Sequence, residues 1–219
     1  MPRILALDAA LACCSVALVA DGVVLASESA AGDRGHAALL PPMAAAVLRA
    51  GGAQALDAIA AVVGPGGFTG IRAALALAEG LALGAGIPVI GVTTGEALTA
   101  AVPAEVRAVR AVWTVIDNRR GRVLLQRFPA GSLVAAGPPE VFAEAELPDP
   151  PPQVAVAGDA AAPIAAWLAA RGCDAMLCDQ RLPEAAAVAA VGALRLAGTL
   201  PPLSARPLYV EPPAVRRPA

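Results

Sequence analysis

A glycine-rich loop, set between an apolar segment and a long run of small residues, most constrains this fold. Residues 58–63 are apolar, and residues 64–70 read Gly-Pro-Gly-Gly-Phe-Thr-Gly. In the run that follows, residues 70–84, only Arg72 and Glu79 carry charge. Glycine allows backbone conformations and close approaches that a Cβ forbids, and a threonine such as Thr69 is a suitable helix cap. The pattern predicts a buried strand, a tight turn and a helix over residues 70–84.

The first hundred residues predict three strands followed by alternating helices and strands. Asp21 and Gly22 form a typical two-residue hairpin turn between the second and third strands. The next helix has Leu39, Leu40, Met43 and Val47 along one stripe. This βββαβα order favours a mixed sheet with helices packed on it. The predicted strands are 3–9, 13–20, 23–29, 58–63 and 88–92, and the predicted helices are 36–49, 70–84 and one that begins at Thr93 or Thr94.

A second, less regular copy of the same pattern follows. The elements predicted there are a hairpin of residues 109–116 and 122–128, a strand at 154–157, and helices at 161–171 and 183–196. We therefore expect an N-terminal lobe of residues 1–102, a smaller lobe of residues 103–199 and a proline-rich tail of residues 200–219. Two such βββαβα lobes with mixed sheets form an α/β protein of the actin-like ATPase (ribonuclease H-like) fold.

Composition excludes several classes of function. The chain is 58% hydrophobic but 3% aromatic, its net charge is −2, and no basic block exceeds two residues. These values argue against an independent RNA-binding surface, which needs basic patches or stacking aromatics. Asp8 interrupts the apolar start, so we expect no secretory signal. Glu79, four glycines and Pro88 argue against a membrane span over residues 73–92. We expect a cytoplasmic protein with no membrane association.

Candidate catalytic and metal-binding residues are few. His36 is the single histidine, and the position one helical turn later is Leu40, so a second metal ligand is missing. Cys173 and Cys178 lack partner ligands and are expected to be small core residues, like Cys13 and Cys14. No G-x-S-x-G nucleophile motif is present. We expect no catalytic residue, no metal and no cofactor.

The glycine loop allows two interpretations. It lacks the Lys-Ser or Lys-Thr of a Walker loop and the third glycine of a dinucleotide motif. Free amides near Thr69 and Gly70 would still suit a phosphate. Alternatively, the glycines permit a tight turn and close docking of the helix, and this interpretation is favoured.

The helix over residues 70–84 is apolar around almost its whole circumference, whereas a surface helix of a monomer has a polar face. The helix before it is almost as poor in charge. Either these helices are fully buried in a compact monomer, or a partner protein covers them. We favour an interface. The residues expected near the contact are Phe68, Thr69, Arg72, Ala73, Ala76 and Gly80, with Leu39 and Met43.

Several segments together resemble the TsaB family. The loop and helix start, GPGGFTGIR at residues 64–72, is similar to the family's GPGSFTGLR. The start of the helix at residues 36–41 resembles HSxxLLP, residues 117–123 resemble the DARRGEVY hairpin, and residues 206–210 resemble the closing PxYLR. The family's first strand usually ends Asp-Thr-Ser, whereas this chain has Asp8, Ala9 and Ala10. The loss of two hydroxyls argues against nucleotide hydrolysis.

The resemblance implies a non-catalytic scaffold with the actin-like fold. Such a subunit binds and activates the paralogous catalytic transferase that places threonylcarbamoyl on tRNA, an accessory ATPase joins the pair, and tRNA is contacted only indirectly. The same surface would support a homodimer when the chain is alone. Two alternatives remain: an active glycoprotease-like peptidase or ATPase of this fold, and an independent protein that binds a small molecule between the lobes.

Overall fold

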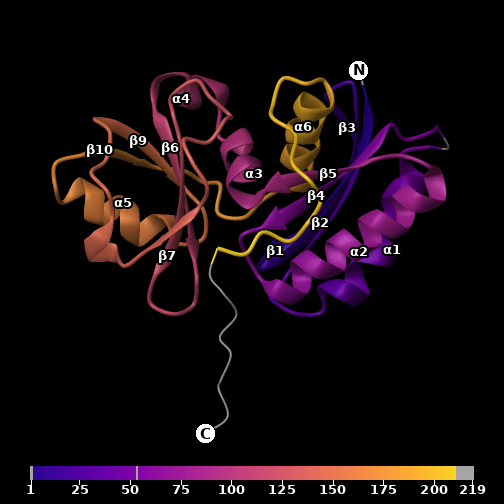
Figure 1. The fold of residues 1–219 in the computed structure, drawn as a ribbon, viewed down its shortest axis with the longest axis horizontal. Coiled ribbons are helices and arrows are strands. Elements are labelled where there is room, and N and C mark those ends of the chain that lie inside the picture. The colour runs from indigo at the N-terminus through magenta and orange to yellow at the C-terminus, as the bar shows by residue number, and fades with distance from the viewer. Residues whose placement is uncertain (1, 53, 211–219) are drawn as a thin grey trace, which may run out of the picture.

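The computed structural model describes residues 2–52 and 54–210, which form two lobes side by side, each built on a five-stranded sheet (Figure 1). In the first sheet the strand order is β3-β2-β1-β4-β5. The pairs β1–β2 and β2–β3 are antiparallel, and β4 and β5 continue the sheet parallel to β1. These strands are β1 (Arg3–Leu11), β2 (Cys13–Ala20), β3 (Val23–Ala31), β4 (Ala58–Gly64) and β5 (Val89–Thr93).

The second sheet repeats this topology in the order β8-β7-β6-β9-β10. Again three antiparallel strands are extended by two parallel ones. The strands are β6 (Ala111–Asp117), β7 (Val123–Phe128), β8 (Glu140–Phe142), β9 (Gln153–Ala157) and β10 (Asp174–Leu177). The repeated mixed sheet confirms the predicted two-lobed α/β fold of the actin-like type. β8 and β10 were not predicted, because three and four residues are too short to show an alternating pattern.

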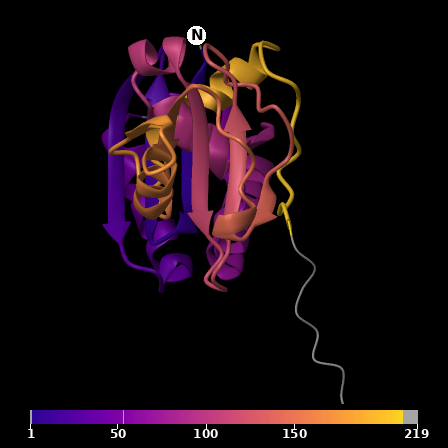
Figure 2. The ribbon, with the colours of Figure 1, turned by 90° about the vertical axis from the view of Figure 1, so that its left-hand side faces the viewer.

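Helices cover both faces of the first sheet. α1 (His36–Ala50) and α2 (Phe68–Ala85) pack against each other on one face, and α6 (Ala185–Leu196) lies on the other (Figure 1). Small residues let α6 approach closely: a Cβ at Gly192 would lie 2.8 Å from the Cβ of Ala60. The hydrophobic core of this lobe is accordingly rich in alanine and valine. In the second lobe, α5 (Ala161–Ala169) lies on the side that faces away from the first lobe (Figure 2).

Two predicted elements are corrected. A strand was expected from residue 109, but α4 (Ala104–Val109) occupies the start of that region and β6 begins only at Ala111. Pro103 precedes α4, and a proline fits the first positions of a helix. The helix grouped by sequence with the second lobe is α6, and it packs on the first sheet instead. Its buried side includes Ala185, Val188 and Val191, which join the first core. The lobe boundaries at residues 102 and 199 stay predictions.

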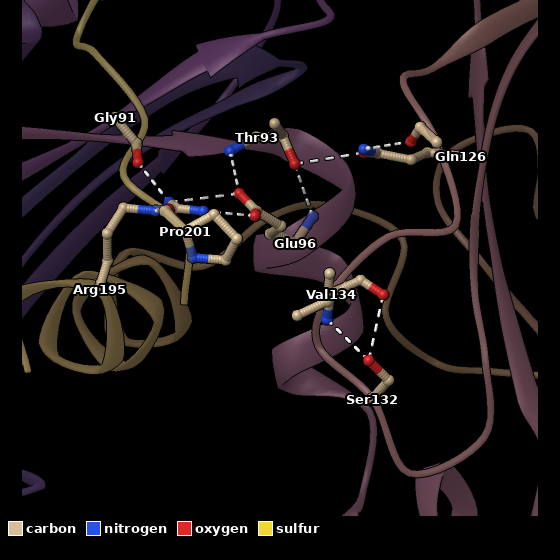
Figure 3. Close-up of polar contacts among 9 residues, drawn as sticks. Gly91, Thr93, Glu96, Gln126, Ser132, Val134, Arg195 and Pro201 are labelled. Atoms are coloured by element: carbon tan, nitrogen blue, oxygen red, sulfur yellow. Dashed lines mark hydrogen bonds and ion pairs between the residues drawn. The ribbon is translucent and has the colours of Figure 1, made fainter. Parts of the chain in front are cut away.

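A buried ion pair joins segments of the first lobe that are distant in sequence (Figure 3). Arg195 of α6 donates to Glu96 of α3 (Thr94–Ala101), with Nη2 2.6 Å from Oε1. The same guanidinium also donates to the carbonyl oxygens of Gly91 and Pro201. Glu96 in turn accepts from the Thr93 amide at 2.8 Å, while the Thr93 hydroxyl accepts from the Glu96 amide, which forms a capping box. The pair therefore fixes the start of α3 and the end of α6 together.

Residues 201–210, here called the C-terminal strap, return along the first lobe. The Gly91 amide donates to Leu203 at 3.1 Å, and the Leu208 amide donates to Val63 at 2.8 Å. A Cβ at Gly91 would come within 2.5 Å of the Ser204 carbonyl oxygen, so glycine is required for this approach. The predicted tail of residues 200–219 therefore begins as an ordered part of the first lobe, and residues 211–219 lie outside the described residues.

Replacing Glu96 by alanine should strongly destabilise the protein. The change leaves the Arg195 guanidinium buried and unpaired, which typically costs about 3–5 kcal/mol of unfolding free energy. Denaturant unfolding measures the loss. The matched control is Glu140→Ala, which breaks the exposed Arg127–Glu140 pair and should cost about 0.5 kcal/mol or less. Equal losses in the two variants would contradict the role given to the buried pair.

Candidate protein interface and interlobe cleft

α2 exposes an apolar face to solvent. Leu83 is 86% exposed, and Ala76, Gly80 and Gly84 are exposed on the same helix. Nothing lies within 4 Å of the position that a Cβ would take at Gly80 or Gly84. Among the described residues, α2 is also the single helix that is long and apolar enough to cross a membrane by length and composition, and only 28% of it is buried. The structure thus leaves most of this helix surface uncovered.

The residues predicted for a partner contact fall mainly on this surface. Phe68, Thr69, Arg72, Ala76 and Gly80 are exposed, and Ala73 is half-buried. On α1, Leu39 is exposed, whereas Met43 points into the core, where its sulfur lies 3.9 Å from that of Cys14. Met43 therefore lies beneath the exposed face rather than on it. The prediction that Thr69 caps α2 is wrong: the helix begins at Phe68, and its N-cap is Gly67 with no side-chain cap.

The start of α2 carries an exposed cluster that includes the C-terminal strap. The guanidinium carbon of Arg72 lies 3.8 Å from the centre of the Phe68 ring. Its Nε and Nη2 donate to the Tyr209 hydroxyl at 3.0 and 2.7 Å. The two rings are 6.0 Å apart, and Tyr209 is 137 residues beyond Arg72 in sequence. Phe68 and Arg72 were predicted at a contact, whereas Tyr209 appeared only in the segment that resembles the family's PxYLR, since no local pattern links it to α2.

The glycine loop packs tightly against the end of β1. The Gly67 amide donates to the Ala10 carbonyl at 2.7 Å. A Cβ at Gly66 would overlap that same carbonyl, and a Cβ at Gly70 would overlap the Ala9 carbonyl. The glycines therefore allow close docking, which supports the favoured interpretation of the loop, and one of its amides is already used within the chain.

Between the lobes lies a cleft of about 660 Å³. One wall is the glycine loop with Phe68, Arg72 and Tyr209, and the other is the turn after β6. That turn carries Asp117, which accepts from the Arg119 amide at 2.7 Å, and the Arg119 side chain pairs with Asp33 at 3.4 Å. The Asp117 amide donates to Asp159, whose pKa is raised by burial. The cleft therefore mixes charges of both signs.

Asp8 lies buried behind the cleft wall. Its Oδ1 accepts from the Ala10 amide at 3.0 Å, and Oδ2 makes no hydrogen bond among the described residues. Burial raises the pKa of Asp8 to about 7, and the hydrogen bond from Ala10 partly opposes this rise. The adjacent residues that line the cleft are Ala9 and Ala10, which offer no side-chain hydroxyl. The residues that follow Asp8 along the strand therefore offer no side-chain hydroxyl to a phosphate in the cleft.

The candidate metal ligands are dispersed. His36 is buried at the start of α1, with Nε2 2.8 Å from the Gly32 carbonyl oxygen. Within residues 2–52 and 54–210, no group of three or more histidine, cysteine or acidic side chains is placed to hold a metal. All four cysteines are free thiols. Cys14 and Cys178 are buried core residues as predicted, whereas Cys13 and Cys173 are only partly buried.

Fold and site together describe an actin-like protein with an exposed apolar helix face beside its cleft. The family model for tRNA N6-adenosine threonylcarbamoyltransferase (TsaD) matches residues 24–147. The chain is 42% identical over 123 residues to the tRNA threonylcarbamoyladenosine biosynthesis protein TsaB of Escherichia coli, a match that covers 55% of this chain and 52% of that protein. The chain belongs to the TsaB/YeaZ family.

Longer matches agree with this placement. YeaZ from Pseudomonas aeruginosa superposes with a TM-score of 0.78 at 29% identity, covering 95% of this chain and 100% of that one. An uncharacterised Mycobacterium bovis protein is 35% identical over 159 residues, 71% of each chain. The chain spans about half the length of the TsaB proteins of E. coli and Haemophilus influenzae that it matches.

The raised pKa of Asp8 predicts a pH-dependent stability. The folded protein holds this proton up to about pH 7, whereas the unfolded chain releases it near pH 4. The contribution of Asp8 to the free energy of unfolding is therefore fully present below about pH 4. It falls by roughly 4 kcal/mol as the pH rises to 7. Asp8→Asn, which mimics the protonated form, should lose less stability than the wild type between pH 5 and pH 8 in denaturant titrations. If the two proteins differed in unfolding free energy by the same amount at pH 5 and at pH 8, the prediction would be contradicted.

Proposed function

We propose that this chain is a non-catalytic scaffold subunit that binds and activates the paralogous threonylcarbamoyltransferase in the modification of tRNA. The observation that carries the proposal is the uncovered face of α2 from Phe68 to Leu83, which is apolar except for Arg72 and Glu79, in a chain of this family. Contiguous apolar surface on a soluble protein typically marks a contact with another protein. The TsaB proteins that this chain matches are named for threonylcarbamoyladenosine biosynthesis, which supports the pathway.

The choice of the transferase as partner rests on shared helices. The transferase family model matches residues 24–147, a range that contains α1 and α2. A protein of that family therefore has counterparts of both helices, and two similar helix pairs can pack about a near-twofold axis. The same geometry accounts for a homodimer when the transferase is absent. In the complex, an accessory ATPase joins the pair and tRNA is contacted through the other subunits, in the cytoplasm.

A scaffold role also agrees with the chemistry that this chain offers. Asp8 has alanines beside it where a nucleotide-hydrolysing protein needs donors, and the Gly67 amide is engaged by Ala10. One P. aeruginosa relative is described as similar to a peptidase, and an active peptidase or ATPase of this fold is the alternative function. A small-molecule-binding protein that uses the interlobe cleft is the third. Both alternatives predict activity or binding by the isolated chain, which the scaffold proposal does not.

Replacing Ala76 by arginine should abolish binding to the transferase while the monomer stays folded. Ala76 is exposed in the middle of α2, so the new guanidinium reaches water in the free protein but clashes with a docked helix. Size-exclusion chromatography of the mixed proteins and thermal melting measure the two effects. The control is Ala166→Arg, the same change at an exposed position of α5, which should leave the complex intact. A variant that binds normally would refute docking on α2.

The isolated chain should transfer no threonylcarbamoyl to tRNA and hydrolyse no ATP above background. Addition of the chain to the transferase and accessory ATPase should raise incorporation of labelled threonylcarbamoyl into tRNA. ATP hydrolysis by the chain alone that disappears in Asp8→Asn would favour the enzyme alternative.

A further inference from the structure

The cluster of Phe68, Arg72 and Tyr209 holds an exposed guanidinium in one place. Phe68 and Tyr209 are 55% and 52% exposed, and Arg72 is exposed between them. Stacking on Phe68 and two hydrogen bonds to Tyr209 fix the plane of the guanidinium. Its Nη1 takes no part in these two hydrogen bonds. An arginine that is ordered before binding loses less side-chain entropy on binding, and its planar fork suits a carboxylate.

Backbone contacts of the C-terminal strap position Tyr209 beside Arg72. The Leu208 amide donates to Val63 at 2.8 Å, directly before Tyr209. A Cβ at Gly64 would lie 3.1 Å from the Leu208 carbonyl oxygen, so the strap is packed closely on the loop that leads into α2. The position of the hydroxyl that holds Arg72 is therefore set by the fold, far from the helix in sequence.

Arg72 also lies in line with the proposed docking surface. Arg72, Ala76 and Gly80 are four residues apart and share one face of α2. We infer that Arg72 is a preorganised receptor for a carboxylate of the transferase, and that Tyr209 is its positioning residue. This inference rests on the proposed function. A carboxylate on a protein is favoured over an RNA backbone because Arg72 shares its face of α2 with the small positions Ala76 and Gly80, and the cleft beside it carries acids as well as arginines rather than a basic surface.

The test measures the affinity of the 219-residue chain for its purified transferase paralogue at low and high salt. Arg72→Gln should weaken binding at least about tenfold and flatten its dependence on salt. The matched control is Arg171→Gln, which removes an exposed arginine stacked at 3.6 Å on Trp167 in the second lobe and should leave the affinity unchanged. Thermal melts check that each variant is folded.

Tyr209→Phe keeps the ring but removes the hydroxyl that accepts from Arg72. It should weaken binding about three- to tenfold in the wild-type background and have no effect in Arg72→Gln, because Tyr209 acts through Arg72. Additive losses of affinity in the double variant would overturn the positioning role. If Tyr209 were merely structural, Tyr209→Phe would weaken binding equally in the wild-type and Arg72→Gln backgrounds.

The outcomes separate this inference from the function on which it rests. If Arg72→Gln binds like the wild type while Ala76→Arg abolishes binding, the carboxylate receptor is refuted and the scaffold function stands. If the wild-type chain does not bind the transferase at all, both are refuted. A further outcome is that the isolated chain binds labelled tRNA and that Arg72→Gln does not. This result would show that the ligand of Arg72 is a phosphate and would refute the carboxylate receptor.

Discussion

The buried ion pair of Arg195 and Glu96 holds together the parts of this protein that the chain order separates. α6 follows the whole second lobe in sequence yet packs on the first sheet, and the Arg195 guanidinium bonds to α3, to the backbone of β5 and to the start of the C-terminal strap. An ion pair away from water gives little net stability, but it penalises any arrangement that leaves one partner unpaired. The strap that carries Tyr209 to α2 begins at Pro201, one of the groups that the Arg195 guanidinium binds.

The two lobes meet through apolar and polar contacts, since Ile116 and Leu124 of the second lobe pack with the core of the first. The Thr93 hydroxyl, at the start of α3, donates to Gln126 of β7 at 3.2 Å (Figure 3), and a Cβ at Gly95 would overlap the Gln126 side chain. Close contact of this kind resists relative movement of the lobes, because packed interiors do not deform continuously. A cleft held in this way suits a rigid body that presents a surface. It suits less well an enzyme that must close around a nucleotide.

The sequence contained most of the information needed for the first lobe, since its strands and helices are long and periodic. A glycine loop was correctly placed between β4 and α2, because glycines mark the end of a strand and the start of a helix, although residues 68–70 already belong to α2. Four features were not accessible in this way. β8 and β10 are too short for periodicity, α6 changes lobes through tertiary packing alone, Met43 turns into the core, and Tyr209 meets Arg72 only after the strap has folded. Each of these depends on contacts between residues far apart in sequence.

The exposed face of α2 has a consequence for how a scaffold of this kind would work in solution. If the same face supports both a homodimer and a complex with the transferase, the two assemblies compete for one surface, and their ratio depends on protein concentrations and relative affinities. Small residues such as Ala76 and Gly80 allow either partner to approach closely but discriminate poorly between them. Discrimination between the two partners then depends on Arg72, the charged residue near the start of α2. In a symmetric homodimer Arg72 would face residues of a second copy, whose α2 carries the exposed acid Glu79, whereas in the proposed pair it would face a carboxylate of the transferase. Under this proposal, the preference for one assembly depends on which carboxylate fits the ordered guanidinium of Arg72 better.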